Sequence, residues 1–151
     1  MKIEDILAKD AVLIDTTSQT KKQFLTNLAS IAQEKTGIDS GIIFDALIER
    51  ERLGTTGVGK GVALPHIRLS GLKDIFCAFI KVNPIDFEAV DNKQIDLAFF
   101  LVVPEEAGSD HLKALARLSR LLRNEKVTNS LRNTDNPNTL YAIITAHDTE
   151  D

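Results

Sequence analysis

The 151 residues of the chain suffice for one domain, 1–151, with one substantial hydrophobic core. Hydrophobic residues make up 43% and charged residues 26%, and no apolar run is long enough to cross a bilayer. The net charge of -4 argues against broad nucleic-acid binding, which requires a basic surface. We therefore expect a soluble globular protein that binds no nucleic acid and is not inserted in a membrane.

The first residues and the cysteine content bear on the compartment. Met1–Leu7 carries acidic side chains early and lacks both a long apolar core and a small-residue cleavage site. A signal peptide is therefore not expected, and we place the protein in the cytoplasm. Cys77 is the single cysteine, so no internal disulfide or pair of thiolate metal ligands is available, and its apolar neighbours indicate a buried side chain.

Two helices are expected in the first third of the chain. The first opens near Ser18 and ends at Gly37, and its apolar residues recur at three- and four-residue spacing: Phe24, Leu25, Leu28, Ile31 and Ala32. The second follows at once, with an apolar face of Ile42, Ile43, Ala46 and Leu47 and with Leu53 as a further candidate. Its basic C-terminal end, with Arg50 and Arg52, directly precedes Gly54.

Strands and further helices follow. The apolar segments 62–64, 75–82 and 95–103 are predicted to be strands buried on both faces, 12–14 is a weaker candidate, and 83–87 and 91–93 have turn composition. Ser109 or Asp110 is expected to cap a helix whose apolar stripe is Leu112, Leu115, Ala116 and Leu122. Asn136 and Pro137 begin a last helix, with Leu140, Ile143 and Ile144 facing inward.

This order of elements predicts the fold class. Helices on both sides of several buried strands indicate an α/β fold, α+β in some schemes. We expect a three-layer α/β/α sandwich with a mixed, mostly buried central sheet flanked by helices.

The most informative segment is the glycine-rich run from Gly54 to His66. Its first seven residues match the start of a nucleotide phosphate-binding loop, G-x-x-x-x-G-K. That loop requires Ser or Thr next, to hold magnesium, and Gly61 stands there instead. The predicted context also runs from helix to strand, whereas a nucleotide loop runs from strand to helix. We therefore reject nucleotide binding by this run.

Two interpretations of the run remain. The glycines alone can serve to permit positive φ angles and a tight reversal. The other interpretation is an oxyanion site, because freed backbone N–H groups, the hydroxyls of Thr55 and Thr56 and the guanidinium of Arg50 are all donors to phosphate oxygens. A histidine, His66, beside such donors favours phosphoryl chemistry.

Residues 50–66 read RERLGTTGVGKGVALPH, and this run resembles the active-site signature of the fructose/mannitol-type IIA proteins of the bacterial phosphotransferase system. Residues 84–91, the strand ending at Pro104, and His111 with its helix fall in the same order as in that family. The resemblance covers nearly the whole chain. At this length, the chain most resembles the nitrogen-regulatory IIA branch.

The resemblance implies that His66 accepts a phosphoryl group from a small histidine-phosphorylated carrier protein, HPr-like, and can pass it on. It also implies that Arg50 contacts the phosphoryl oxygens and that His111 is the second active-site histidine. The phosphate-binding loop would comprise Thr55, Thr56 and Gly57. No cofactor or metal is required, because the donor already carries the phosphoryl group.

The positions of the other histidines indicate their roles. His111 lies in the first turn of its helix, so its side chain can project beside the apolar stripe toward the sheet; a capping or exposed histidine is the alternative from the residues alone. His147 lies in the polar segment 146–151 and is expected to be solvated. A zinc site is not expected, because neither H-E-x-x-H nor another close ligand spacing occurs.

One position departs from the family pattern. Glycine usually follows the active histidine there, whereas this chain has Ile67, followed by Arg68. A β-branched residue does not readily adopt the backbone angles open to glycine, so the loop must differ here if the family glycine needs those angles. Alternatively, Ile67 adds apolar docking area for the partner.

Three functions follow from this sequence. The first is a phosphoryl carrier whose phosphorylation regulates nitrogen- or potassium-related target proteins, and the lack of a fused IIB or membrane segment favours it. The second is a sugar-transport component that passes phosphate to a fructose- or mannitol-type IIB. The third is a non-catalytic binding module, against which the intact set of Arg50, His66 and His111 weighs.

Overall fold

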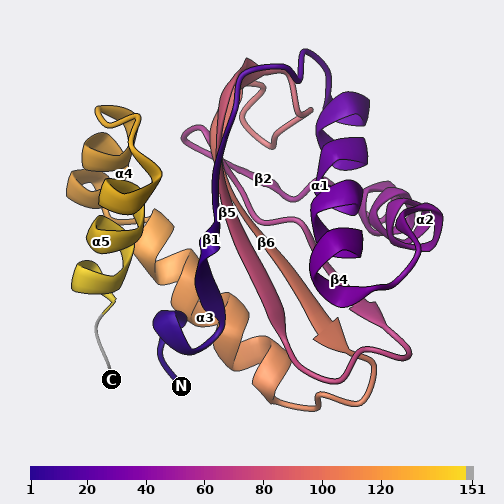
Figure 1. Cartoon of the computed structure of the whole chain (residues 1–151). Helices are drawn as coiled ribbons and strands as arrows, with labels where there is room; N and C mark the ends of the chain where they lie inside the picture. Colours follow the sequence, from indigo (N-terminus) through magenta and orange to yellow (C-terminus); the bar gives the residue numbers. More distant parts are fainter. Residues whose placement is uncertain (149–151) are drawn as a thin grey trace.

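The computed structural model describes residues 1–148 of the chain (Figure 1). Its helices are the 3-10 helix η1 (Ile3–Asp5) and the α-helices α1 (Lys21–Thr36), α2 (Ser40–Arg52), α3 (Asp110–Leu122), α4 (Glu125–Arg132) and α5 (Pro137–His147). Its strands are β1 (Leu7–Asp15), β2 (Gly57–Gly59), β3 (Val62–Ala63), β4 (His66–Leu69), β5 (Phe76–Ile85) and β6 (Ile95–Pro104).

The described strands form one mixed six-stranded sheet in the order β1-β5-β6-β3-β2, with β4 also paired to β6. β1 runs parallel to β5, and β3 and β4 run parallel to β6, whereas the β5–β6 and β2–β3 pairs are antiparallel. Figure 1 shows α1 and α2 on one side of the sheet and α3, α4 and α5 on the other. This arrangement confirms the predicted three-layer α/β/α fold with a mixed sheet.

β3 and β4 form one extended track along β6. Val62 pairs with Leu97 and His66 pairs with Leu101, so both pairs have the same register offset. Between the two strands, the carbonyl of Pro65 accepts a hydrogen bond from the backbone N–H of Leu101 at 3.0 Å. The central strand β6 therefore fixes the position of His66 from both sides along the chain.

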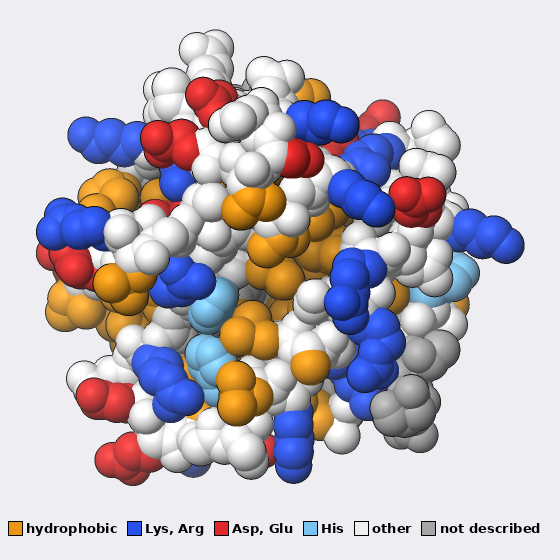
Figure 2. Space-filling view, turned by 180° about the vertical axis from the view of Figure 1, so that it is seen from behind, with side chains coloured by type: hydrophobic (Ala, Val, Ile, Leu, Met, Phe, Trp, Pro, Cys, Tyr) orange, Lys and Arg blue, Asp and Glu red, His pale blue; other side chains and the backbone are white. Residues whose placement is uncertain are grey.

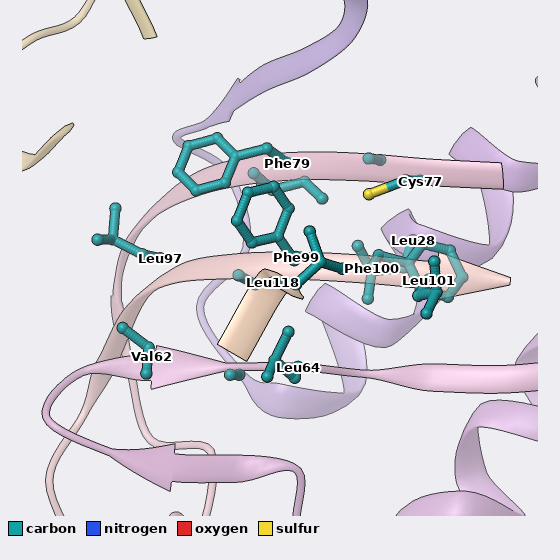
Figure 3. Close-up of a cluster of buried hydrophobic side chains, with 14 of the residues drawn as sticks. Leu28, Val62, Leu64, Cys77, Phe79, Leu97, Phe99, Phe100, Leu101 and Leu118 are labelled. Atoms are coloured by element: carbon teal, nitrogen blue, oxygen red, sulfur yellow. The ribbon is translucent and has the colours of Figure 1, made fainter. Parts of the chain in front are cut away.

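The core lies around β5 and β6, as their continuous apolarity predicts. The Phe79 and Phe99 rings, on adjacent strands, have centroids 5.0 Å apart in an edge-on arrangement, and both side chains are fully buried (Figure 3). Cys77 is also fully buried, and burial raises the pKa of its thiol. The prediction of a buried apolar cysteine is confirmed.

Helix ends form where local signals predict them. The hydroxyl of Thr20 accepts the N–H of Gln23 at the start of α1, and Gly37 ends that helix with φ +76°. Asn136 caps α5, with Pro137 in its first turn. Within residues 1–148, no helix has both the length and the apolarity to span a bilayer.

The strand predictions need corrections at β1, β5, β2 and β4, and neither β2 nor β4 was predicted. β1 extends over Leu7–Asp15, whereas only residues 12–14 were predicted to form a strand. It lies at the edge of the sheet, where polar residues such as Lys9 and Asp10 are exposed and interrupt the apolar pattern. β5 continues through Pro84 to Ile85 instead of ending in a turn at 83–87. Its pairing with β6 is irregular between Lys81 and Ile85, so the missing N–H of proline breaks no regular ladder.

The predicted apolar faces of α2 and α3 were partly wrong. Leu112 is 67% exposed and Ala116 is exposed, whereas Leu122 is buried as predicted, together with three residues outside the predicted stripe: Ala114, Leu118 and Leu121. Ser109 makes no side-chain capping bond. Ile42 and Leu53, assigned to the buried face of α2, are 58% and 84% exposed. Three large apolar side chains of these helices and their ends are thus exposed at the surface: Ile42, Leu53 and Leu112.

Candidate functional site

The C-terminal end of α2, the start of β4 and the first turn of α3 enclose one cleft. The cleft measures about 420 Å³ and is lined by Ala46, Glu49, Arg50, Leu53, His66, Ile67, Arg68 and His111. Figure 2 shows two adjacent histidine side chains on this face, with basic and apolar side chains around them. The fold therefore brings together three residues that the sequence singled out, from three separate elements: Arg50, His66 and His111.

The contacts of His66 define its tautomer. Nδ1 lies 2.7 Å from the carbonyl oxygen of Leu64, and a carbonyl only accepts, so Nδ1 carries the proton. On the other side of the ring, Nε of Arg50 donates to Nε2 at 3.4 Å. Nε2 therefore holds the lone pair, which is the arrangement required of a nitrogen nucleophile.

The pKa of His66 is lower than that of an ordinary histidine. Burial is the main cause, and the positive charge of Arg50 acts in the same direction. The hydrogen bond to Leu64 and the negative charge of Glu51 act in the opposite direction, with a smaller effect. The imidazole is consequently neutral, and its Nε2 unprotonated, at pH 7.

His111 faces His66 from α3. The two ring centroids are 5.6 Å apart, with an angle of 70° between the ring planes. Burial, the charge of Arg68 and the proximity of His66 all lower the pKa of His111. Within residues 1–148, its buried Nδ1 has no hydrogen-bond partner. The second histidine is thus neutral and retains unused hydrogen-bonding capacity beside the first.

Arg50 is held in place by the glycine-rich run itself. Its Nη1 donates to the carbonyl oxygen of Gly54 at 2.8 Å, which directs the guanidinium across the turn that follows α2. Arg52 pairs instead with Glu49 at 2.9 Å, and both of these side chains are largely exposed. Of the two arginines at the end of this helix, only Arg50 contacts His66 among the described residues.

The three loop residues predicted to bind phosphate are engaged in hydrogen bonds with one another, with α2 and with the segment after β5. Thr56 is 2% exposed, and both its N–H and its hydroxyl donate to the carboxylate of Glu51. The hydroxyl of Thr55 donates a hydrogen bond to the backbone carbonyl of Phe87 and accepts one from the backbone N–H of Gly57. None of the three lines the cleft. Their bonds hold the loop, and a direct contact with phosphate stays a prediction.

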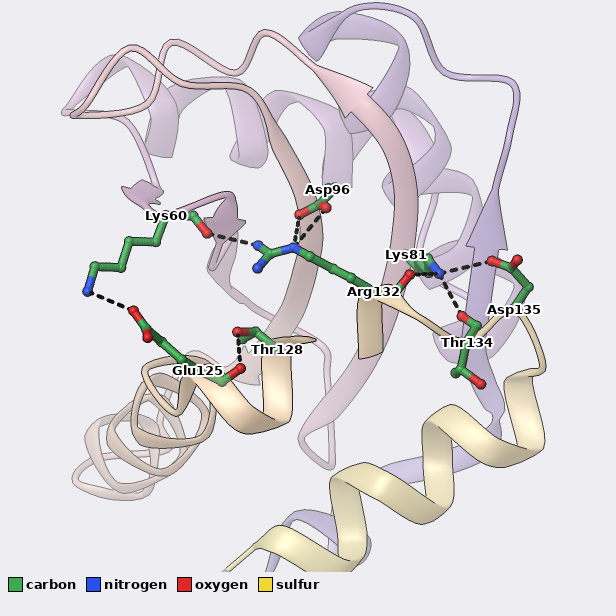
Figure 4. A network of polar contacts seen from close by, with 8 residues as sticks. All are labelled: Lys60, Lys81, Asp96, Glu125, Thr128, Arg132, Thr134 and Asp135. Atoms are coloured by element: carbon green, nitrogen blue, oxygen red, sulfur yellow. Dashed lines mark hydrogen bonds and ion pairs between the residues drawn. The ribbon is translucent and has the colours of Figure 1, made fainter. Parts of the chain in front are cut away.

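Gly61, the residue that breaks the nucleotide motif, has a packing role beside Arg132, whose contacts with Asp96 and Lys60 are drawn in Figure 4. Arg132 Nε donates to both carboxylate oxygens of Asp96, at 3.0 and 2.9 Å, and its Nη2 donates to the Lys60 carbonyl at 2.8 Å. Gly61 has φ +80°, and a Cβ placed there would lie 2.6 Å from Nη2 of Arg132. The run also proceeds from α2 to β2, which confirms the predicted helix-to-strand order.

Ile67 needs no glycine-like backbone. It lies in β4 in regular register with Val102 and is not among the described residues with positive φ. The side chain is only 5% exposed, so it contributes little area to a docking partner. The family glycine is therefore replaced by a residue that fills the core beneath the cleft.

Arg68 is the site residue that the sequence interpretation missed. It lines the cleft, lowers the pKa of His111 and donates from Nη1 to the carbonyl of Glu105 at 3.1 Å. The two-residue spacing of His66 and Arg68 could have indicated this role, because alternate residues of a strand project from the same face.

Metal ligands do not gather in the described part of the chain. Residues 1–148 contain no group of three His, Cys, Asp or Glu side chains placed to hold an ion. His147 is exposed at the end of α5, as expected for a solvated residue, with Nδ1 2.9 Å from the carbonyl of Ile143.

The mixed three-layer sandwich is the fold of solved phosphotransferase-system IIA structures. Residues 5–147 match the family of phosphoenolpyruvate-dependent sugar phosphotransferase system EIIA 2 proteins, and the chain belongs to that family. It is 45% identical to a nitrogen regulatory protein of Bradyrhizobium diazoefficiens over 145 residues, which cover 95% of each chain.

Two further similarities extend this finding. The chain is 34% identical over 146 residues to a fructose-specific EIIA component of Haloferax volcanii, which covers 94% of each chain. The crystal structure of the nitrogen regulatory protein IIA-Ntr from Neisseria meningitidis superimposes with a TM-score of 0.89 at 33% identity, covering 95% of this chain and 99% of that one. The fold and the family are therefore shared with both regulatory and sugar-specific proteins.

Proposed function

We propose that the protein is a phosphoryl carrier that accepts its phosphoryl group on Nε2 of His66 from an HPr-like phosphohistidine protein. The observation that carries this proposal is the tautomer of His66, with its proton held by Leu64 and its lone pair on Nε2. In the transfer, a bond forms between Nε2 and phosphorus while the bond from phosphorus to the donor nitrogen breaks. The electron pair of that broken bond returns to the donor imidazole. Neither a nucleotide nor a metal takes part.

The surrounding charges suit this reaction. Phosphoryl transfer passes through a loose transition state whose charge is spread over the equatorial oxygens, so positioning and electrostatic stabilisation supply most of the catalysis. Arg50 is close enough to move from Nε2 onto an arriving phosphoryl oxygen, and Arg68 lines the same cleft. Neutral His111 is close enough to His66 to donate a hydrogen bond to the phosphoryl group as well.

We further propose a regulatory output in the cytoplasm. A phosphoryl group adds about two negative charges to a cleft bordered by exposed Leu53, and so alters which proteins bind there. We propose nitrogen- or potassium-related regulatory proteins as targets, and the 45% identity to a nitrogen regulatory protein supports the nitrogen-related ones. The alternative is a sugar-transport role, with onward transfer to a fructose- or mannitol-type IIB; the fructose-specific relative supports it at lower identity.

The test is a phosphorylation assay with purified, phosphorylated carrier protein. The wild-type chain and His147→Ala should acquire acid-labile, alkali-stable phosphate, whereas His66→Ala should acquire none. Transfer that survives in His66→Ala would refute the assignment of this residue. Absence of transfer to the wild type would favour the non-catalytic binding module. Adding a purified IIB then separates the two carrier roles, because only the transport role requires onward transfer.

A further inference from the structure

Glu51 is a buried carboxylate next to Arg50 that does not line the histidine cleft. It lies in the last turn of α2, and its side chain is 7% exposed. It accepts hydrogen bonds from the backbone N–H of Thr56 at 3.0 Å and from the Thr56 hydroxyl. These two hydrogen bonds join the end of α2 to the glycine-rich run.

The negative charge of Glu51 is balanced from α1. Lys21 Nζ lies 2.9 Å from the Glu51 carboxylate and 4.5 Å from the centroid of the Phe87 ring. The Lys21 side chain is 16% exposed, so the pair is largely removed from water. Moving the Glu51 carboxylate away from Lys21 would leave an uncompensated charge in this buried place, so the ion pair holds the carboxylate in position.

A continuous series of hydrogen bonds leads from this carboxylate to His66. Glu51 holds Thr56, the carbonyl of Thr56 accepts the N–H of Leu64 at 2.9 Å, and the carbonyl of Leu64 accepts the Nδ1 proton of His66 at 2.7 Å. The last bond selects the tautomer with a free Nε2. A displacement of Thr56 therefore moves the group that orients the imidazole.

We propose that Glu51 is a positioning residue for the phosphoryl acceptor, acting on His66 through Thr56 and Leu64. This inference rests on the proposed function, in which Nε2 is the nucleophile. It assigns to Glu51, the one glutamate of the signature, a role distinct from the contact that Arg50 makes, and it explains why Thr56 is turned away from the cleft.

The charge of Glu51 gives the proposal a second readout. The charged groups around His66 are Glu49, Arg50 and Glu51 on α2, Arg68 on β4, and the titratable His111 on α3. Of these, Arg50 lowers and Glu51 raises the pKa of His66. Removing the charge of Glu51 should therefore lower that pKa further, and the pH below which His66 becomes protonated should fall with it.

The variants separate position from charge. Glu51→Gln removes the charge and keeps an acceptor for the N–H of Thr56. Thr56→Val removes the hydroxyl bond and keeps the charge, and Thr56→Ser restores the hydroxyl. Asp45→Asn is the matched control, because it removes an exposed carboxylate from the same helix. For each protein, ¹⁵N spectra of the His66 ring report the tautomer and its pKa, and single-turnover transfer from phosphorylated carrier reports the rate.

We expect Glu51→Gln and Thr56→Val to reduce the Nδ1–H tautomer and to slow transfer about 10-fold, because small displacements of reacting groups are costly. Both variants should also lower the His66 pKa, because the hydrogen bond to Leu64 raises it, and Glu51→Gln should lower it more, since it removes a charge as well. Thr56→Ser and Asp45→Asn should behave as wild type. A lower melting temperature with an unchanged tautomer and rate would overturn the proposal. If the wild type accepts no phosphate, the proposed function fails, while the ring spectra still decide the role of Glu51.

Discussion

Arg50 Nε lies 3.4 Å from Nε2 of His66, although sixteen residues separate them in the chain. The glycine-rich run makes this approach possible, because it carries the chain from the end of α2 back into the sheet, and its Gly54 carbonyl anchors the same guanidinium at 2.8 Å. The two side chains form one electrostatic unit. Burial lowers the pKa of the imidazole most, the arginine lowers it further, and the arginine already lies beside the atom that would receive phosphate.

Arg50→Gln should slow phosphoryl transfer from the carrier about 100-fold, as expected for the loss of one donor aimed at developing charge. It should also raise the pKa of His66, because a nearby positive charge that lowers the pKa is removed. Single-turnover transfer and an NMR titration of the ring measure the two effects.

Arg52→Gln is the matched control for Arg50→Gln. Arg52 lies two residues further along α2, is 69% exposed and pairs with Glu49. It should leave both the transfer rate and the His66 pKa unchanged. Equal effects from the two variants would show that general positive charge at the helix end matters, and not the contact with His66.

Acidification should inactivate His66 and destabilise the fold over the same pH range. The folded-state pKa values of His66 and His111 are lowered, so the unfolded chain binds more protons near their ordinary pKa of about 6.5. Their contribution to stability is therefore complete above that pH and is lost as pH falls toward the folded values. Chemical denaturation between pH 7.5 and 5 should show this decrease.

The double variant His66→Gln/His111→Gln tests the origin of that decrease. If the two histidines cause it, the free energy of unfolding of the double variant should depend less on pH over this range. A slope equal to that of the wild type would assign the loss to other groups.

Sequence sufficed wherever a local signal determines the structure. Gly37 ends α1 because it adopts a positive φ, which glycine tolerates and a helix does not contain. Asn136 followed by Pro137 is a typical start of a helix, and α5 begins there. The apolar runs of β5 and β6 are buried on both faces, as continuous apolarity requires. Arg50, His66 and His111 lie at one cleft, as the resemblance of residues 50–66 and of the helix around His111 to a known family had indicated.

Sequence failed where tertiary contacts decide. Pro65 interrupts the apolar run, so β4 was not predicted, yet pairing with β6 continues through it. Leu112 fits an apolar stripe by spacing, but the packing of α3 on the sheet leaves it exposed. Thr56 looked like a phosphate donor because a hydroxyl is a suitable group, and only the structure shows Glu51 using it.

Ile67→Gly, which introduces the usual family residue, should destabilise this protein. The side chain is 5% exposed within β4, so its removal leaves a cavity, and glycine weakens a strand. We expect a loss of about 4 kcal/mol in the free energy of unfolding, against about 1 kcal/mol for Ile67→Val. Urea denaturation of the three proteins measures both values. A neutral or stabilising Ile67→Gly would mean that the isoleucine is strained in its strand.

Gly61→Ser completes the sequence of a nucleotide phosphate-binding loop, G-x-x-x-x-G-K-S, and should nevertheless bind no nucleotide. The run connects a helix to a strand, so its backbone N–H groups do not open a helix as a nucleotide loop requires. A side chain at this position also meets Arg132. Arg132 is held in place by two hydrogen bonds to the Asp96 carboxylate and one to the Lys60 carbonyl. Calorimetric titration with ATP and magnesium checks binding.

Gly71→Ser separates the two causes of the stability loss expected in Gly61→Ser. The two glycines have nearly the same φ, +80° and +83°, but a Cβ at Gly71 meets no atom within 4 Å. Gly71→Ser should therefore lose only the backbone contribution, about 1 kcal/mol, whereas Gly61→Ser should lose about 3 kcal/mol because Arg132 must also move. Equal losses would show that Arg132 yields freely, and that the glycine is required by its φ angle alone.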